Sequence, residues 1–410
     1  MKAIHLALSA HGGAGIAAGR SVRALREQGI DAEFWTADGS ELGPAVRKPR
    51  WTWWRARLDR LPLRFYRRKQ LFTGWSNNWQ SSGLAARVNQ AKPDIVNLHW
   101  VGGGFLSLRE LSRFEAPVVW TLHDAWALTG GCHYPDRCRG YTSRCGKCPQ
   151  LGSESPHDLS WLNLRAKRTK LSDVAAFVTP SAWLAGLAAA SGAVAPGRLH
   201  VIPYGLDGMT FSPMAMDKSR RQWGLPADAV LLLAGAQDLS ERRKGCHLLR
   251  DAVARVVAAV PGRYVLVLFG ANHQVTNRDW PCEVRWLGTL REEGEIARIC
   301  SAADVLLLPS LQDNLPNLAL EAQACGCPVV GFDEGGLREI IEPGRTGLLA
   351  QETTAASLAD AMRAWLTKAP DRAEVSARAR ARFEREFSLS VHGRRMAALY
   401  ALLLGNKPQR

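Results

Sequence analysis

Short runs of hydrophobic residues recur along the chain, and each is followed by a helix-sized stretch. The runs lie at residues 4–8, 95–98, 118–122, 177–179, 201–203, 230–233, 265–269, 284–287, 305–308 and 329–332. Strands that alternate with helices, and that are too apolar to leave one face in water, are typical of parallel sheets covered by helices. The pattern therefore predicts an α/β protein.

This rhythm breaks once, where Pro and Gly interrupt residues 202–208 and Pro213 follows. The break predicts an N-terminal domain over residues 1–207 and a C-terminal domain over residues 208–387. Each is about the size of one doubly wound, Rossmann-like domain. Residues 375–404 have a helical pattern, and we treat 388–410 as a final helix.

The composition is that of a globular protein, with 410 residues, 46% hydrophobic and 22% charged. No apolar run approaches the roughly 20 residues that a transmembrane helix needs. The first ten residues resemble a strand more than a signal peptide, and nine scattered cysteines argue against a secreted disulfide framework. These features favour a cytoplasmic protein.

The charge balance is strongly basic, with 53 Lys and Arg against 38 Asp and Glu, a net charge of +15. Such a charge favours anionic partners, which include nucleotides, nucleic acids and anionic membranes. Charge alone does not choose among these classes.

One segment, from Arg47 to Trp79, interleaves arginines with aromatic residues and contains Asp59 as its only acid. Tryptophan and tyrosine favour the bilayer interface, and each nearby cation adds about 1 kcal/mol of attraction to an anionic leaflet. The segment therefore predicts peripheral docking on the inner face of the cell membrane. The alternative is that its tryptophans pack beneath the domain and its arginines are merely solvated.

A glycine-rich loop with Gly12, Gly13 and Gly15 follows the first predicted strand. Glycines let backbone N–H groups approach an anion at a helix N-terminus, so a phosphorylated ligand is one interpretation. A tight turn between strand and helix is the other.

The second half contains a pair of carboxylates near a predicted helix start. Asp313 follows the strand that ends at Leu308, Pro316 suits the first helical turn, and Glu321 lies about one turn further. A carboxylate accepts two hydrogen bonds from a vicinal diol, so the pair favours a sugar or ribose site. A solvated loop Asp and a surface Glu form the alternative.

Three cations, Arg242, Arg243 and Lys244, follow another predicted strand. They are suited to clamp a diphosphate and to stabilise a phosphate leaving group. A solvated charge run is the alternative.

Four cysteines have the spacing C-x5-C-x6-C-x2-C, at Cys132, Cys138, Cys145 and Cys148. A structural zinc site needs four such ligands, and His133 is a substitute for one of them. Disulfides and free thiols stay open as alternatives.

His123 ends an apolar strand at the sheet edge where a ligand is expected, and His99 ends the strand before it. A histidine bonded only for local structure is the alternative in each case.

Together these motifs resemble retaining glycosyltransferases of family 4. The resemblance rests on the glycine loop, Lys244-Gly245, the stretch from Asp313 to Glu321, Gly335-Gly336 and the run from Gly344 to Leu348. The segments 120–126, 130–134 and 145–149 are similar to bacterial exopolysaccharide transferases of the colanic-acid type.

The resemblance implies a GT-B fold, with two Rossmann-like domains facing a cleft and a last helix that crosses back to the first domain. It also implies a nucleotide-sugar donor, with UDP or GDP as the nucleotide, and no catalytic metal. The acceptor that it suggests is a lipid-linked saccharide.

Site residues carry over position by position. In the family's pattern Glu321 binds the nucleotide ribose, and Asp313 stands where a longer glutamate contacts the donor sugar. Lys244 matches the phosphate-binding lysine, while Leu239 replaces the usual arginine, a role we assign to Arg243. His123 matches a histidine close to the donor sugar, and Asn314 and Asn317 are assigned to substrate binding.

The sequence thus predicts a retaining hexosyltransferase for surface polysaccharides. One rival is a nucleotide-sugar epimerase of the same architecture, which would need no acceptor. The other is a basic nucleic-acid-binding protein, a function that would not explain the carboxylates in the stretch from Asp313 to Glu321.

Overall fold

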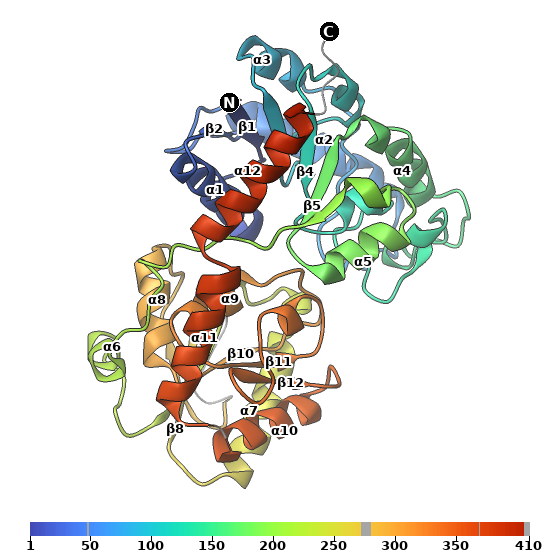
Figure 1. Ribbon diagram of the computed structural model, residues 1–410. Coiled ribbons are helices and arrows are strands. Elements are labelled where there is room, and N and C mark those ends of the chain that lie inside the picture. Colours follow the sequence, from blue (N-terminus) through green and yellow to red (C-terminus); the bar gives the residue numbers. More distant parts are fainter. Residues whose placement is uncertain (47–48, 272–279, 369, 406–410) are drawn as a thin grey trace. The chain divides into compact units, whose positions relative to one another are not determined.

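The computed structural model describes residues 1–46, 49–271, 280–368 and 370–405. The chain divides into two compact units, the first formed by Met1–Gly205 with Leu389–Arg410 and the second by Leu206–Ser388. Each unit contains one sheet with helices packed on it (Figure 1).

The first unit has a six-stranded sheet in the order β2-β1-β3-β4-β5-β6, and every neighbouring pair is parallel. Its strands are β1 (Lys2–Leu6), β2 (Asp31–Trp35), β3 (Ile95–Leu98), β4 (Val118–Thr121), β5 (Ala176–Thr179) and β6 (Leu199–Val201). The hydrophobic runs identify five of these strands. They miss β2, an edge strand in which Asp31 and Glu33 interrupt the apolar residues.

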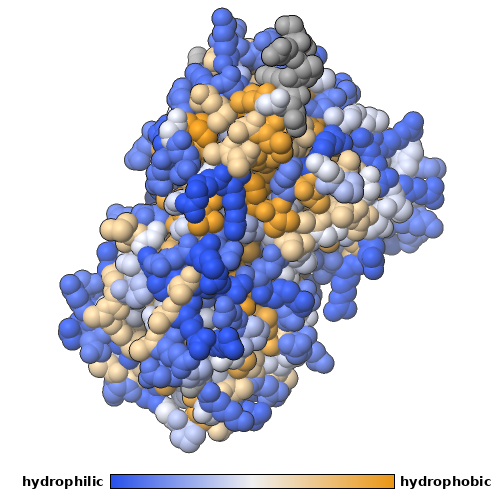
Figure 2. All heavy atoms as spheres, in the orientation of Figure 1, coloured by the Kyte–Doolittle hydropathy of each residue, from blue (hydrophilic) through white to orange (hydrophobic). Residues whose placement is uncertain are grey.

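The helices of the first unit are α1 (Gly12–Glu27), α2 (Pro49–Arg60), α3 (Leu84–Gln90), α4 (Leu159–Arg168), α5 (Ala182–Ala190) and α12 (Leu389–Gly405). Helix α12 packs against α1, and its side chains Met396, Leu399 and Tyr400 enter the core beneath β1 and β2. Figure 2 shows apolar atoms gathered over the part of this unit where α12 lies, and Leu402 is 53% exposed there.

The second unit repeats the architecture with the sheet order β12-β11-β10-β7-β8-β9. Its strands are β7 (Val230–Asp238), β8 (Tyr264–Ala271), β9 (Glu283–Trp286), β10 (Val305–Leu308), β11 (Val329–Phe332) and β12 (Gly347–Ala350). Its helices are α6 (Met216–Gln222), α7 (Cys246–Ala259), α8 (Glu293–Ala302), α9 (Asn317–Ala324), α10 (Ala355–Lys368) and α11 (Arg372–Glu386). The two parallel sheets confirm the predicted α/β class.

The helical pattern predicted over 375–404 is two helices, because the chain leaves the helical conformation between Glu386 and Leu389. Among the described residues, no helix combines the length and the apolar character needed to cross a bilayer.

Candidate active site

In the second unit, the loop after β7 lies against the end of β10. The loop contains a short 3₁₀ helix, Arg242–Lys244, followed by Gly245 in the left-handed region with φ 69°. A Cβ at Gly245 would lie 1.7 Å from the carbonyl oxygen of Pro309, so only glycine permits this approach. The contact brings Lys244 beside Asp313, 69 residues later in the chain.

Asp313 is buried and paired with both predicted phosphate-binding cations. Its Oδ2 lies 2.6 Å from Lys244 Nζ, and its Oδ1 lies 3.3 Å from Arg243 Nη1. The backbone N–H of Asn314 also donates to Oδ1, at 3.0 Å. Burial by itself would raise the pKa of Asp313, but Lys244 and Arg243 lower it to about 2. The carboxylate therefore stays ionised, and the interpretation of Asp313 as a solvated loop residue is wrong.

The two cations differ in what else they contact. Arg243 donates to both carboxylate oxygens of Glu241, at 3.0 and 3.3 Å, and to the carbonyl oxygen of Gln312, at 2.9 Å. The Lys244 side chain is 22% exposed, compared with 9% for Arg243. Arg243 thus ties the two loops together, and Lys244 is the more accessible cation for an anionic ligand.

Helix α9 carries Glu321, as the sequence predicts, but in a buried position. Glu321 is 5% exposed and Asn314 is 2% exposed, because residues 319–324 of α9 are all buried and α11 packs on this helix. The alternative interpretation of Glu321 as a surface residue is therefore wrong. Pro316 occupies the N-cap position of α9, and Asn317 is its first helical residue.

In the first unit, the glycine loop is a close contact between strand end and helix start. Gly12 has φ 76° and begins α1. A Cβ at Gly15 would lie 2.5 Å from the carbonyl oxygen of Ser9 and 2.6 Å from the carbonyl carbon of Ala10. The tight-turn interpretation thus explains Gly15, and anion binding by the N–H groups of Gly12 and Gly13 stays a prediction.

His123 lies just after β4 in a small pocket of the first unit, lined in part by His99, Trp100, Asp124 and Trp126. Its Nε2 is 2.9 Å from Nδ1 of His99, and its Nδ1 is 2.7 Å from the hydroxyl of Tyr204. Burial lowers the pKa of His123 to about 4, although the neighbouring Asp124 acts in the opposite direction. The ring is therefore neutral near pH 7.

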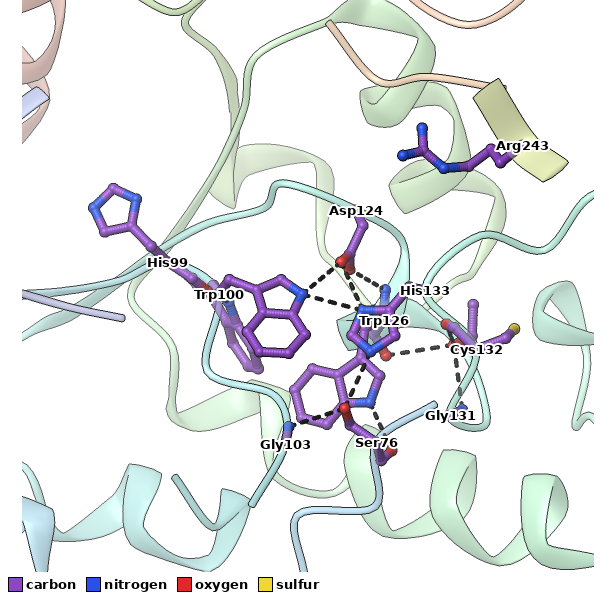
Figure 3. A network of polar contacts seen from close by, with 12 residues as sticks. Ser76, His99, Trp100, Gly103, Asp124, Trp126, Gly131, Cys132, His133 and Arg243 are labelled. Atoms are coloured by element: carbon purple, nitrogen blue, oxygen red, sulfur yellow. Dashed lines mark hydrogen bonds and ion pairs between the residues drawn. The ribbon is translucent and has the colours of Figure 1, made fainter. Parts of the chain in front are cut away.

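A polar network beside this pocket was not predicted (Figure 3). Asp124 Oδ2 accepts hydrogen bonds from Trp100 Nε1 at 3.0 Å and from His133 Nδ1 at 2.7 Å, and its Oδ1 accepts from the Trp126 N–H at 2.8 Å. Nε2 of His133 lies 3.1 Å from the Ser76 hydroxyl. The sequence motifs singled out only segments 120–126 and 130–134, with their tryptophans and histidines, as part of a site. Ser76 is distant from them in sequence, so no local pattern related it to this network.

The four cysteines do not form a metal site in this structure. Cys132 and Cys148 are buried, Cys138 and Cys145 are half-buried, and all four are free thiols. Within the described part of the chain, no group of three or more His, Cys, Asp or Glu side chains is placed to hold a metal ion. The two ring nitrogens of His133 lie within hydrogen-bond distance of Asp124 and Ser76, so this structure does not place His133 as a substitute ligand.

Comparison with known proteins decides the family. Residues 12–205 match the description "Glycosyl transferase 4-like domain", and residues 228–368 match "Glycosyl transferases group 1". The chain therefore belongs to the glycosyltransferases in which a glycosyl transferase 4-like domain is followed by a group 1 domain.

Among curated relatives, the putative colanic acid biosynthesis glycosyl transferase WcaC of Escherichia coli is 27% identical over 268 residues, which cover 62% of this chain and 63% of WcaC. A D-inositol 3-phosphate glycosyltransferase of Stackebrandtia nassauensis is 34% identical over 200 residues, 44% of each chain. The matched segments thus span less than two thirds of these family members.

Solved glycosyltransferase structures share the fold over nearly the whole chain. Sucrose-phosphate synthase of Thermosynechococcus elongatus has a TM-score of 0.71 at 20% identity and covers 99% of this chain and 100% of its own. HepE of Anabaena has a TM-score of 0.68 at 19% identity, covering 98% and 100%. The fold is therefore GT-B, as the resemblance implied.

Proposed function

We propose that this family member is a retaining glycosyltransferase that moves a hexose from a UDP- or GDP-sugar to a lipid-linked saccharide during surface polysaccharide biosynthesis. The observation that carries the proposal is the ion pair between the half-buried Lys244 and the buried Asp313, 2.6 Å apart, on the loops that follow β7 and β10. HepE of Anabaena has been solved with UDP and with UDP-glucose, and WcaC is named for colanic acid biosynthesis; both support this class of donor and product.

The pair suits a donor that carries hydroxyls and a diphosphate. An ammonium group has three N–H donors, so Lys244 can keep its bond to Asp313 and still donate to phosphate oxygens. Asp313, ionised at any working pH, accepts from hydroxyls of the sugar. Glu321 accepts from the ribose, while Arg243 holds the loop that carries Asp313.

The reaction then needs no side-chain nucleophile. The bond between the anomeric carbon and the phosphate oxygen breaks, and its electron pair leaves with the diphosphate. The acceptor hydroxyl attacks from the same face, and its proton passes to the departing phosphate oxygen. Negative charge on that oxygen grows in the transition state, where Lys244 stabilises it more than in the ground state.

A thermal-shift screen with UDP-, GDP- and ADP-sugars tests the donor site. A ligand that binds only the folded protein stabilises it by RT ln(1 + [L]/Kd), about 2.7 kcal/mol at a hundredfold excess over Kd. We expect one class of nucleotide sugar to raise the melting temperature of the parent and not of Glu321→Ala. If no nucleotide sugar shifts the parent at millimolar concentration, the proposal fails.

Product analysis separates the two rival functions. Conversion of the donor sugar in the absence of any acceptor would identify an epimerase. Tight oligonucleotide binding that weakens steeply with salt would identify a nucleic-acid-binding protein.

We also propose that the first unit docks on an anionic membrane surface. The exposed face of α2 and of the 3₁₀ helix Leu61–Phe65 supports this. Five large apolar side chains are exposed there: Trp53 (56%), Trp54 (54%), Leu58 (48%), Leu61 (45%) and Phe65 (86%). The guanidinium of Arg57 lies 5.4 Å from the ring centroid of Trp53. We call the five exposed apolar residues, without Arg57, the aromatic face.

The opposite side of α2 is anchored to the body of the unit. Arg55 donates to the carbonyl oxygens of Gly104, Ser81 and Gln80, and the buried Asp59 accepts the backbone N–H groups of Asn77 and Asn78. These hydrogen bonds hold α2 on the unit, so its aromatic face is exposed to solvent. Trp75 is buried at 4% exposure and takes no part, and the side chain of Trp51 lies outside the described residues.

Exposed cations continue the aromatic face, and a charge-matched comparison tests their role. The exposed cations are Arg64, Arg67, Arg68 and Lys69. Their replacement by Gln should abolish co-sedimentation with vesicles of anionic lipid at low salt. Four exposed arginines of the second unit serve as the control with an equal change of charge: Arg250, Arg285, Arg363 and Arg385. Equal binding by both variants would remove the docking role.

A further inference from the structure

Five buried rings form an unbroken hydrogen-bonded chain through the first unit. The hydroxyl of Tyr400 on α12 lies 3.1 Å from Nε2 of His5, and Nδ1 of His5 lies 2.8 Å from Nε2 of His99. Nδ1 of His99 then lies 2.9 Å from Nε2 of His123, whose Nδ1 is 2.7 Å from the hydroxyl of Tyr204. Each of these residues is less than 10% exposed.

The amide of Asn97 sets the direction of this chain. Its Oδ1 accepts a hydrogen bond from the hydroxyl of Thr121 at 3.0 Å, and its Nδ2 faces Tyr400 and donates to the phenol oxygen at 2.7 Å. The hydrogen of the Tyr400 hydroxyl is then left for Nε2 of His5. A neutral imidazole has one N–H and one acceptor nitrogen, so each ring that accepts at Nε2 donates at Nδ1 to the next ring.

All three histidines are neutral in this arrangement. Burial lowers the pKa of His5 to about 3 and of His123 to about 4, and it lowers the pKa of His99 well below its usual range. Asp124 is the charged neighbour of His123, and its carboxylate is already bonded to His133. The chain therefore holds one proton per ring.

Helix α12 supplies one end of the hydrogen-bonded chain and contacts the backbone next to the other end. Tyr400 is the first ring of the hydrogen-bonded chain. His392, two turns earlier on α12, donates from Nδ1 to the carbonyl oxygen of Pro203 at 2.7 Å. Nε2 of His392 accepts from the Ser21 hydroxyl at 2.9 Å, and burial, assisted by the nearby Arg395, keeps the pKa of His392 low. The backbone that carries Tyr204 is thus held by the same helix.

We propose that Tyr400, His5 and His99 are positioning residues that hold His123 in its Nδ1–H tautomer. The proposal rests on the function proposed above, together with the family resemblance, which implies that His123 lies close to the donor sugar. A neutral His123 that donates to Tyr204 does not repel the positive charge that develops on the sugar in the transition state. It also leaves the hydroxyl hydrogen of Tyr204 oriented away from His123.

Nitrogen-15 NMR of histidine-labelled protein tests the tautomer directly, without any activity. We expect His5, His99 and His123 to carry their proton on Nδ1 in the parent. Tyr400→Phe removes the donor that starts the chain, so His123 should become a mixture of tautomers, although residue 400 does not touch it. Met396→Leu, a buried change one turn earlier on α12, should leave all three rings unchanged.

An Nε2–H tautomer of His123 in the parent would reverse the chain and overturn the proposal. An unchanged His123 in folded Tyr400→Phe would do the same. Asn97→Leu is the second variant, because it removes the amide that sets the direction while keeping Tyr400. It should also give mixed tautomers at His123.

Kinetics separates this inference from the function on which it rests. In Tyr400→Phe we expect kcat to fall by about tenfold, or about 1.4 kcal/mol, with the donor KM unchanged. The acid limb of the pH profile should move to higher pH, because a ring outside the fixed chain is protonated more easily. An unchanged acid limb would oppose the inference. A parent that transfers no sugar yet shows the expected tautomers would refute the function alone.

Discussion

Acid should destabilise the first unit well before its carboxylates titrate, because the unit buries four neutral histidines. They are His5, His99, His123 and His392, all less than 10% exposed. Burial lowers the pKa of His5 to about 3, of His123 and His392 to about 4, and of His99 well below 6.5. Below pH 6.5 the unfolded chain binds protons at these positions and the folded chain does not. Stability therefore falls as the pH falls from about 6.5 toward 4.

The magnitude follows from proton linkage. Each such histidine should remove about 1.2 kcal/mol between pH 7.0 and 5.5, so the four together remove about 5 kcal/mol. This is a large part of the 5 to 15 kcal/mol that typically stabilises a folded domain. Two other buried groups account for fewer protons than the four histidines: Lys167, whose pKa burial lowers to about 7, titrates at the upper edge of this window, and Asp59, whose pKa burial raises, acts in the opposite direction with at most one proton.

Urea unfolding followed by tryptophan fluorescence at pH 7.0, 6.5, 6.0 and 5.5 measures this effect. Eleven of the fifteen tryptophans lie in residues 1–205, so the signal reports mainly on the first unit. The variant His392→Asn should lose about a quarter of the pH dependence. His157→Asn, at an exposed position, is the control and should keep all of it. A total change below about 1.2 kcal/mol, the effect of one histidine, would refute the reasoning.

Four further outcomes are expected. Lys244→Ala should depress kcat far more than the donor KM, and an effect confined to KM would limit Lys244 to ground-state binding. Asp313→Asn should also lower activity by at least tenfold while leaving the fold intact at neutral pH, as circular dichroism would check. Gly15→Ala should cost about 1 to 3 kcal/mol in unfolding free energy, because its Cβ would overlap the backbone of Ser9; an unchanged urea midpoint would contradict the close packing. Metal analysis of protein purified without chelator under reducing conditions should find no zinc bound by the four cysteines, since their thiols are not placed as a ligand set, and one zinc per chain would contradict this.

Local sequence patterns determine most of the two sheets. Strands β3, β10 and β11 lie at the predicted residues, because a strand buried on both faces is a mostly apolar run whose signal needs no distant partner. The edge strands β2 and β12 escape prediction, since one borders solvent and tolerates charge and the other is a four-residue Gly-Leu-Leu-Ala segment. The glycines that allow close backbone contact, Gly15 and Gly245, are also visible in the sequence, although what they contact is not.

The candidate site follows the same division. Asp313, Glu321 and Lys244 are recognisable from their motifs, since each lies in a short segment at the end of a predicted strand. The burial of Asp313 and Glu321, and the pairing of Asp313 with Lys244 across 69 residues, depend on loops that only the folded sheet brings together. The chain of histidines is a stronger case, because Tyr400 and His5 are 395 residues apart and no local pattern relates them. Residue type and spacing determine which groups are available, whereas hydrogen-bond direction, tautomer and pKa arise from burial and distant neighbours, which only the tertiary structure supplies.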